Sequence, residues 1–166
     1  MTARPLISVV IPAYNYAHVL RRAVESVAAQ LDEHSELLII DDGSSDETPA
    51  LIEALHHQFG NFRSLRKENG GLASVRNRGI AETRGDYLIF LDADDEMAPG
   101  ALRAARQHIE QFPHSRMVIG GYLAKTCGRT VERTPQALPQ TPQERVRGYL
   151  IDKNINLSNG ACVMHR

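Results

Sequence analysis

The sequence has no apolar run long enough to cross a bilayer, no excess of positive charge and only two cysteines. A membrane-spanning helix needs about 20 consecutive apolar residues, and the first eight residues do not have the layout of a signal peptide. The net charge of −1 gives no basic surface for nucleic acid or anionic lipid. Cys127 and Cys162 lack metal-ligand spacing, and we expect buried thiols of a reduced compartment rather than a disulfide. These absences together predict a cytoplasmic protein without a nucleic-acid partner.

The alternation of apolar and polar segments predicts one α/β domain. A length of 166 residues suits a single domain, and 42% hydrophobic residues are enough for a sizeable core. Short apolar runs alternate with longer segments of helical periodicity, which implies right-handed crossovers and a mostly parallel central sheet. Strands are expected at 7–11, 36–40, 62–66, 87–91, 116–122, 130–133 and 161–164. Helices are expected at 16–30, from 46 to 60, 72–83, 99–111 and, after a capping box at 141–144, up to 150.

Acidic residues follow two of the expected strands. Asp92, Asp94 and Asp95 come directly after the apolar run Tyr87–Leu91, and the pair Asp41-Asp42 comes directly after Leu37–Ile40. Because ligands bind at the carboxyl ends of parallel strands, we expect these acids on one rim of the sheet. Carboxylates this close repel one another unless a cation lies between them. The pattern therefore predicts a divalent metal such as Mg²⁺ that holds a phosphorylated ligand.

Two turns next to these strands have two interpretations each. The turn Pro12–Asn15 is either an ordinary connection with an asparagine cap or a place where Tyr14 offers its ring to a base. The turn Asn69–Gly71 precedes a helix and could hold phosphate with backbone N–H groups, although it lacks the lysine and hydroxyl residue of a P-loop.

Four basic or titratable positions are less informative. Arg76 and Arg78 on the helix after Gly71 either face the acidic rim or lie on a solvated helix surface. The pair His56-His57 is expected on the surface, because no histidine in the chain has metal-ligand spacing.

Four segments, in this order, closely resemble the family 2 glycosyltransferases of the GT-A fold. The segments are Ser8–Asn15, Ile39–Thr48, Asn69–Ala73 with Arg76-Asn77, and Asp92–Asp95, so the resemblance covers about residues 6 to 112. It implies a three-layer α/β/α sandwich that moves a sugar from a nucleotide-diphosphate donor, with UDP-sugars favoured, to a hydroxyl acceptor with inversion. It also implies Mn²⁺ or Mg²⁺ on the diphosphate, and a glycan, glycolipid or other hydroxyl compound as acceptor.

The resemblance also implies roles for individual residues. Asp94 would coordinate the metal, and Asp92 would support the metal or the ribose. Asp42 would bind the base, typically uracil through its N3 hydrogen. The other residues that it assigns to the nucleotide site are Pro12, Tyr14, Asn15, Gly43, Gly70, Gly71 and Arg76.

The catalytic base of such an enzyme is expected beyond Arg166. We therefore expect residues 1–112 to be the donor-binding part and residues 113–166 to begin an acceptor-side part of a longer protein, inactive by itself. Membrane association of that longer protein remains compatible with the sequence. His165, near the end of the last expected strand, is not expected to act at the site.

Two other functions stay open on the sequence alone. A phosphohydrolase of the haloacid-dehalogenase type also places Asp-x-Asp after an apolar strand, although normally the first strand rather than the fourth. The domain could instead be a non-catalytic module that binds a nucleotide-sugar. A receiver domain fits poorly, because its phosphoacceptor and lysine layout is absent.

Overall fold

The computed structural model describes residues 6–166 except 127, 136–140, 142, 145–146 and 148–157. The first half alternates strands and helices: β1 (Ile7–Ala13), α1 (Leu20–Ala28), β2 (Ser35–Asp41), α2 (Thr48–Phe59), β3 (Arg63–Arg66), α3 (Gly71–Glu82), β4 (Tyr87–Phe90) and α4 (Ala101–Gln111). The second half contains β5 (Met117–Ile119), β6 (Tyr122–Thr126), β7 (Arg129–Arg133), the 3₁₀ turn η1 (Asn159–Ala161) and β8 (Cys162–His165).

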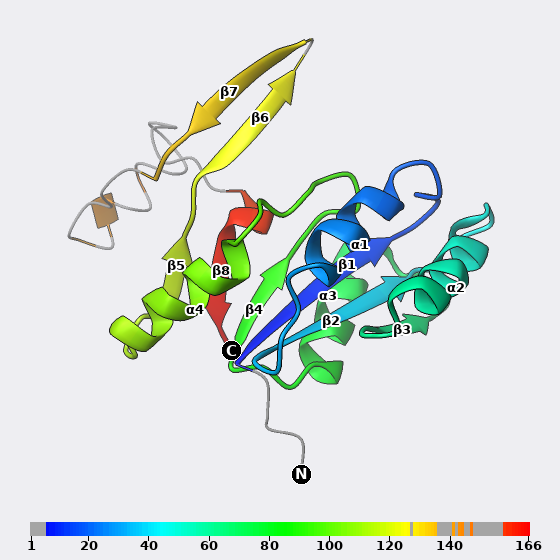
Figure 1. The fold of residues 1–166 in the computed structure, drawn as a ribbon, viewed down its shortest axis with the longest axis horizontal. Coiled ribbons are helices and arrows are strands. Elements are labelled where there is room, and N and C mark those ends of the chain that lie inside the picture. The colour runs from blue at the N-terminus through cyan, green and yellow to red at the C-terminus, as the bar shows by residue number, and fades with distance from the viewer. Residues whose placement is uncertain (1–5, 127, 136–140, 142, 145–146, 148–157) are drawn as a thin grey trace.

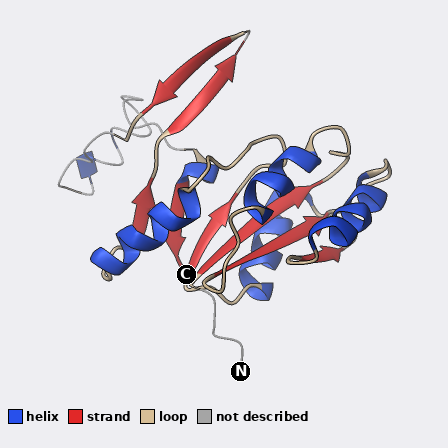
Figure 2. Cartoon of the chain, in the orientation of Figure 1, coloured by secondary structure: helices blue, strands red, loops and turns tan. Residues whose placement is uncertain are grey.

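The main sheet is mostly parallel, as predicted. Its strand order is β3-β2-β1-β4-β8-β5, in which β3, β2, β1 and β4 pair in parallel and β8 runs antiparallel to both of its neighbours. Helices α1, α2 and α4 cover one face of this sheet and α3 covers the other (Figure 1). Colouring by secondary structure makes the three layers visible, with strands between helices (Figure 2). The fold is thus the α/β/α sandwich that the family resemblance implied.

The core has two parts because the strands alternate their side chains between the two faces of the sheet. Val9, Ile11 and Ile39 point toward α1 and α2, whereas Val10 and Ile40 point toward α3. All five are fully buried. The central strands are apolar on both faces because helices cover both faces, which is typical of parallel sheets.

Gly79 allows α3 to lie unusually close to β1. A Cβ atom at this position would come 2.8 Å from Cγ1 of Val10. A contact this short would force the helix away from the sheet. The close approach brings the first turn of α3, which carries Gly71, against the end of β2.

Pro12 does not stop the first strand, which was expected to end at Ile11. β1 continues to Ala13, and Pro12 pairs with Ile40 of β2. The carbonyl of Val10 accepts from Leu91 N, on the β4 side. The carbonyl of Ala13 accepts from Asp42 N, on the β2 side. The backbone of Pro12 therefore faces the β4 side, where pairing ends at Val10. The missing N–H of proline removes no ladder bond there.

The segment 116–122, expected as one strand, is two. Gly120 and Gly121 separate β5, which joins the main sheet, from β6, which pairs with β7 in a sheet of two strands. The β6–β7 hairpin extends away from the main sheet (Figure 1). The strand expected at 130–133 is confirmed as β7, and the strand expected at 161–164 is β8.

Most of the helix expected at 142–150 lies outside the described residues. Its predicted start is nevertheless visible, because Thr141 N donates to Glu144 Oε2 and Glu144 N donates back to Thr141 Oγ1. This is the reciprocal pairing of a capping box.

Cys162 is buried, as expected, and burial raises the pKa of its thiol. Cys127 lies outside the described residues. Among the helices that the structure describes, none is long and apolar enough to span a bilayer.

Candidate functional site

The loops that follow β1 and β2 are joined through Asn15. Its side-chain Oδ1 accepts from the backbone N–H of Ser45 at 2.8 Å and of Asp46 at 3.3 Å. Its own backbone N–H donates to Ser44 Oγ at 2.9 Å. Asn15 therefore does cap a turn, but the turn belongs to the β2–α2 loop and not to α1.

The backbone of Asn15 is in the left-handed region, with a φ of 58°. Among the described residues it is the only non-glycine with a positive φ. Asparagine tolerates this conformation better than most residues. Strain of this kind persists only where surrounding contacts hold it, and the contacts to Ser44, Ser45 and Asp46 do so here.

The same two loops share further hydrogen bonds just before α1. Tyr16 N donates to Thr48 Oγ1 at 2.9 Å, and Ala17 N donates to Asp46 Oδ2 at 3.2 Å. α1 begins at Leu20 instead of the expected Tyr16, because the backbone of Val19 is not helical, with a φ of −130°. The hydrogen bonds fix the loop after β1 to the loop after β2.

Asp42, at the end of β2, caps the N-terminus of α3. Gly71 N donates to Asp42 Oδ2 at 2.8 Å, Gly70 N lies 3.1 Å from Oδ1, and Lys67 Nζ donates to Oδ1. The carboxylate is buried, with 2% of the residue exposed. Burial opposes its ionisation, but the hydrogen bonds from Lys67, Gly70 and Gly71 and the charge of Lys67 outweigh that effect and lower the pKa of Asp42.

This arrangement changes the interpretation of the glycine turn. The N–H groups of Gly70 and Gly71 were considered as a phosphate cradle, but in this structure they bind the carboxylate of Asp42. The helix N-terminus does hold an anion, as its dipole favours. That anion is a side chain from the end of a neighbouring strand, so the structure brings together three of the residues predicted for the nucleotide site.

Position 43 requires glycine, because of its backbone conformation and its close neighbours. Its φ is +76°, and a Cβ atom there would lie 3.0 Å from Asn69 N and 3.2 Å from Lys67 O. Glycine alone allows both this backbone conformation and the close approach of the loop after β3. That approach places Lys67 and Gly70 around Asp42.

Pro12 is the second-last residue of the neighbouring strand β1, and Tyr14 directly follows that strand. Pro12 is buried, whereas Tyr14 is 46% exposed. An exposed tyrosine beside a polar rim has a ring face free for stacking. Both residues therefore lie at the rim where the sequence placed them.

Arg76 and Asp92 are paired on the α3 side of the sheet. Arg76 Nη2 lies 3.6 Å from Asp92 Oδ1, and the guanidinium lies over the ring of Phe90 at 5.7 Å from its centroid. The Nε of Arg76 is buried and has no hydrogen-bond partner. Of the two interpretations of Arg76, the structure therefore supports the one that faces the rim acids. Arg78, by contrast, pairs with Glu82 on the exposed surface of its own helix.

The acids after β4 crowd one turn. Burial raises the pKa of Asp95, and the negative charges of Asp94 and Asp92 raise it further. Asp94 is exposed and Asp92 is half exposed, so both carboxylates remain accessible from solvent. Mutual repulsion among three carboxylates is relieved when a cation binds, and Mg²⁺ or Mn²⁺ prefers oxygen ligands of this kind.

A complete protein cage for a metal is not present among the described residues, where no three His, Cys, Asp or Glu side chains gather closely enough. Magnesium sites on phosphorylated ligands commonly use only one or two carboxylates, since phosphate oxygens and water complete the shell. Asp92 and Asp94 fit a site of that second type.

Sequence reasoning missed Lys67. A basic residue at the end of a mixed strand has the pattern of a solvated side chain, and nothing in the sequence links it to Asp42, 25 positions earlier. His165 pairs with Tyr87 at the start of β4 and thus lies at the opposite end of that strand from Asp92.

Comparison with known proteins identifies the family. Residues 8–166 match the family model described as glycosyl transferase family 2. The chain therefore belongs to glycosyltransferase family 2. The glycosyltransferase GlyG of Streptococcus pneumoniae is 34% identical over 118 residues, which are 70% of this chain and 39% of GlyG.

Two solved structures share the fold. TarS of S. aureus, in a complex with UDP-GlcNAc, has a TM-score of 0.73 and 23% identity, covering 96% of this chain and 45% of that one. The mannosyltransferase PcManGT of Pyrobaculum calidifontis, with GDP-Man and Mn²⁺, has a TM-score of 0.67 and 18% identity, covering 99% of this chain and 46% of that one. The GT-A fold expected from the sequence is thereby confirmed. The chain spans less than half the length of each of these proteins.

Proposed function

We propose that the protein containing this chain transfers a sugar from a nucleotide-diphosphate donor to a hydroxyl acceptor, and that residues 1–112 bind the donor. The observation that carries the proposal is the convergence of three strand ends on one rim. β1 delivers Tyr14, β2 delivers Asp42 and β4 delivers Asp92 and Asp94, next to the N-terminus of α3. The carboxyl ends of parallel strands are the usual ligand-binding edge of such a sheet.

The base would lie between Tyr14 and Asp42. Tyr14 offers an exposed ring for stacking, and Asp42 offers carboxylate oxygens for an N–H of the base. Both oxygens of Asp42 already accept hydrogen bonds, so a base N–H binds either to a remaining lone pair or in place of Lys67. UDP is the favoured donor nucleotide, and TarS, which shares the fold, binds UDP-GlcNAc.

The diphosphate would lie between Arg76 and Asp94. The buried Nε of Arg76 has an unused donor, and a phosphate oxygen is a strong acceptor for it. Asp94, with Asp92, would hold Mn²⁺ or Mg²⁺, which neutralises the charge of the leaving nucleoside diphosphate. PcManGT, with the same fold, was solved with GDP-Man and Mn²⁺.

The acceptor and the catalytic base would be supplied by other residues. We propose an inverting reaction, in which a carboxylate outside this chain removes the acceptor proton on the opposite side of the sugar. Residues 113–166 would begin the acceptor side, for a glycan, glycolipid or other hydroxyl acceptor. This chain alone would bind donor and not turn it over. The family match gives no support to the phosphohydrolase alternative.

Thermal unfolding of the chain with different nucleotides tests the donor site. UDP, GDP, CDP and dTDP are each added with and without Mn²⁺, and Mn²⁺ is also added alone. Ligand at 100 times its dissociation constant should stabilise the domain by about 2.7 kcal/mol, which is a shift of several degrees at this size. We expect UDP to raise the midpoint of thermal unfolding only when Mn²⁺ is present. Equal shifts for all four nucleotides without metal would contradict both the base pocket and the metal site.

A further inference from the structure

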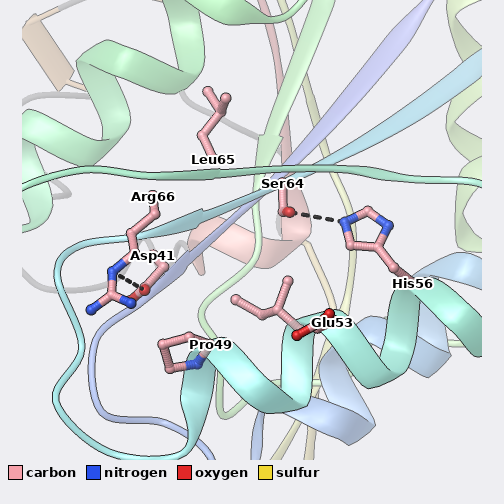
Figure 3. A pocket seen from close by; sticks show the side chains of 8 residues that line it. Asp41, Pro49, Glu53, His56, Ser64, Leu65 and Arg66 are labelled. Atoms are coloured by element: carbon pink, nitrogen blue, oxygen red, sulfur yellow. Dashed lines mark hydrogen bonds and ion pairs between the residues drawn. The ribbon is translucent and has the colours of Figure 1, made fainter.

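A cavity lies on the face of the sheet that α2 covers, between α2 and the edge strand β3. Its volume is about 280 Å³, near the lower end of the range for small-molecule sites. Figure 3 shows its labelled side chains, with Pro49 and Glu53 on α2, the ring of His56 facing Ser64, and Arg66 beside Asp41. The residues that line it are Asp41, Pro49, Ile52, Glu53, His56, Ser64, Leu65 and Arg66.

This cavity is separate from the rim proposed for the donor. Side chains of β2 alternate between the faces of the sheet, and Asp41 follows Ile39 toward α2 while Asp42 follows Ile40 toward α3. The sheet itself therefore divides the two sites.

One carboxylate oxygen in the cavity lacks a hydrogen bond. Asp41 is 2% exposed; its Oδ1 accepts from Ser44 N at 2.9 Å, while its Oδ2 is buried without a hydrogen-bond partner. Arg66 Nε lies 3.3 Å from Oδ2, so the charges are paired but without hydrogen-bond geometry. A buried carboxylate oxygen left in this state is costly. A ligand with N–H donors would supply what is missing.

The other lining groups define the chemistry of that ligand. Glu53 brings a second carboxylate, which has no ion-pair or hydrogen-bond partner among the described residues. Ser64 Oγ is already bonded to His56 Nε2 at 2.8 Å. The lining thus contains two carboxylates and one guanidinium, and Pro49 and Ile52 add apolar surface. The charges of these three side chains sum to −1, next to an apolar surface.

We propose that this cavity binds a small organic cation with a primary ammonium group. The ammonium donates to Asp41 Oδ2 and to the carboxylate of Glu53, and the carbon chain lies against Pro49 and Ile52. A metal ion is the less suitable occupant, because the residues described here contain no cluster of three metal-ligating side chains.

Propylammonium is the probe, and 1-propanol is its neutral match. Each is titrated into the ¹⁵N-labelled chain, and the amide shifts of Glu53, Ser64 and Arg66 are followed. We expect saturable shifts with propylammonium at a dissociation constant on the order of millimolar, the affinity that a ligand of so few atoms can reach. We expect none with 1-propanol. Tetramethylammonium, which has charge but no N–H donor, should bind at least about tenfold more weakly.

Glu53→Gln is the test variant, because Asp41 also holds Ser44 and its replacement could disturb the fold. Loss of the charged hydrogen bond should weaken the binding of propylammonium by about tenfold. Glu47→Gln is the matched control, since Glu47 is an exposed acid just before the same helix and lies outside the cavity lining. The affinity of Glu47→Gln for propylammonium should equal that of the unaltered chain.

Three results would overturn the proposal. The first is identical shifts with propylammonium and 1-propanol, and the second is unchanged affinity in Glu53→Gln. The third is a response of the same amides to Mg²⁺ but not to propylammonium, which would make the cavity a metal site.

Discussion

Asp41 and Asp42 are adjacent in the chain, yet their carboxylates lie on opposite faces of the sheet. Asp41 faces the cavity beside α2, and Asp42 accepts hydrogen bonds from the first residues of α3. Two acids that look like one acidic pair in the sequence therefore have different partners and different roles.

Replacing Asp42 with asparagine should destabilise the fold at neutral pH. The change removes the charge that Lys67 and the N-terminus of α3 face, and losing hydrogen bonds to a buried charged group costs about 1–3 kcal/mol. Because the folded state lowers the pKa of Asp42, its contribution is present above the unfolded value of 3.8 and is lost as the pH falls below it. Urea denaturation at several pH values should show the two proteins converging below about pH 4. Glu68→Gln, an exposed acid in the adjacent loop, should change stability by less than about 0.5 kcal/mol at any pH.

Replacing Asp94 with asparagine should abolish metal-dependent nucleotide binding and leave the fold intact. Asp94 is exposed, so its removal disturbs little packing. Calorimetric titration with UDP and Mn²⁺ measures the loss, and thermal unfolding without ligand checks the fold. Glu33→Gln, an exposed acid before β2, is the matched control and should bind like the unaltered chain. Full Mn²⁺-dependent UDP affinity in Asp94→Asn would remove Asp94 from the metal site.

Asn15 can be tested with two replacements that separate its backbone and its side chain. Asn15→Gly keeps the positive φ and loses only the acceptor for Ser45 and Asp46. Asn15→Ala loses the acceptor and also strains the backbone, which should cost about 1–2 kcal/mol more. Chemical denaturation gives both values. Equal stabilities of the two variants would mean that the left-handed conformation of this residue carries no strain.

Replacing Asp95 with asparagine should stabilise the protein, and the gain should depend on pH. Burial and the charges of Asp94 and Asp92 raise the pKa of Asp95, so its ionised form is less favourable in the folded state. The unaltered protein therefore loses stability as the pH rises from the unfolded value of 3.8 through the raised pKa, and asparagine avoids that loss. Thermal unfolding in a chelator should show a higher midpoint for the variant at about pH 7 and no difference at about pH 3. A gain of the same size at both pH values would mean that charge is not its cause.

Much of the framework could be predicted from local patterns. The four-residue and five-residue apolar runs predicted β2 and β4, and Pro49 and Gly60 marked the two ends of α2 because each has one favoured place in a helix. The acids at the strand ends were placed on one rim by the rule for parallel sheets alone.

What could not be predicted depends on contacts between distant segments. The expected start of α1 at Tyr16 was wrong because the backbone of Val19 is not helical, with a φ of −130°, and the segment before it is bonded to Thr48, 32 positions from Tyr16. The glycines at the start of α3 were candidates for binding phosphate until the fold placed Asp42 against them. In that case the local pattern was sound, and a side chain from the end of another strand decided the outcome.

The apolar residues of β2 do not by themselves fix the register of this strand in the sheet. Leu37, Leu38, Ile39 and Ile40 are all buried, so a shift of one residue would still present apolar side chains to both helical layers. The alignment is set by the polar residues at its ends, Glu36, which accepts from Ser8, and the two aspartates. A single-residue deletion within this strand would thus remove one buried apolar side chain and also exchange the carboxylate of the rim with that of the cavity, whereas a two-residue deletion would keep each acid on its own face.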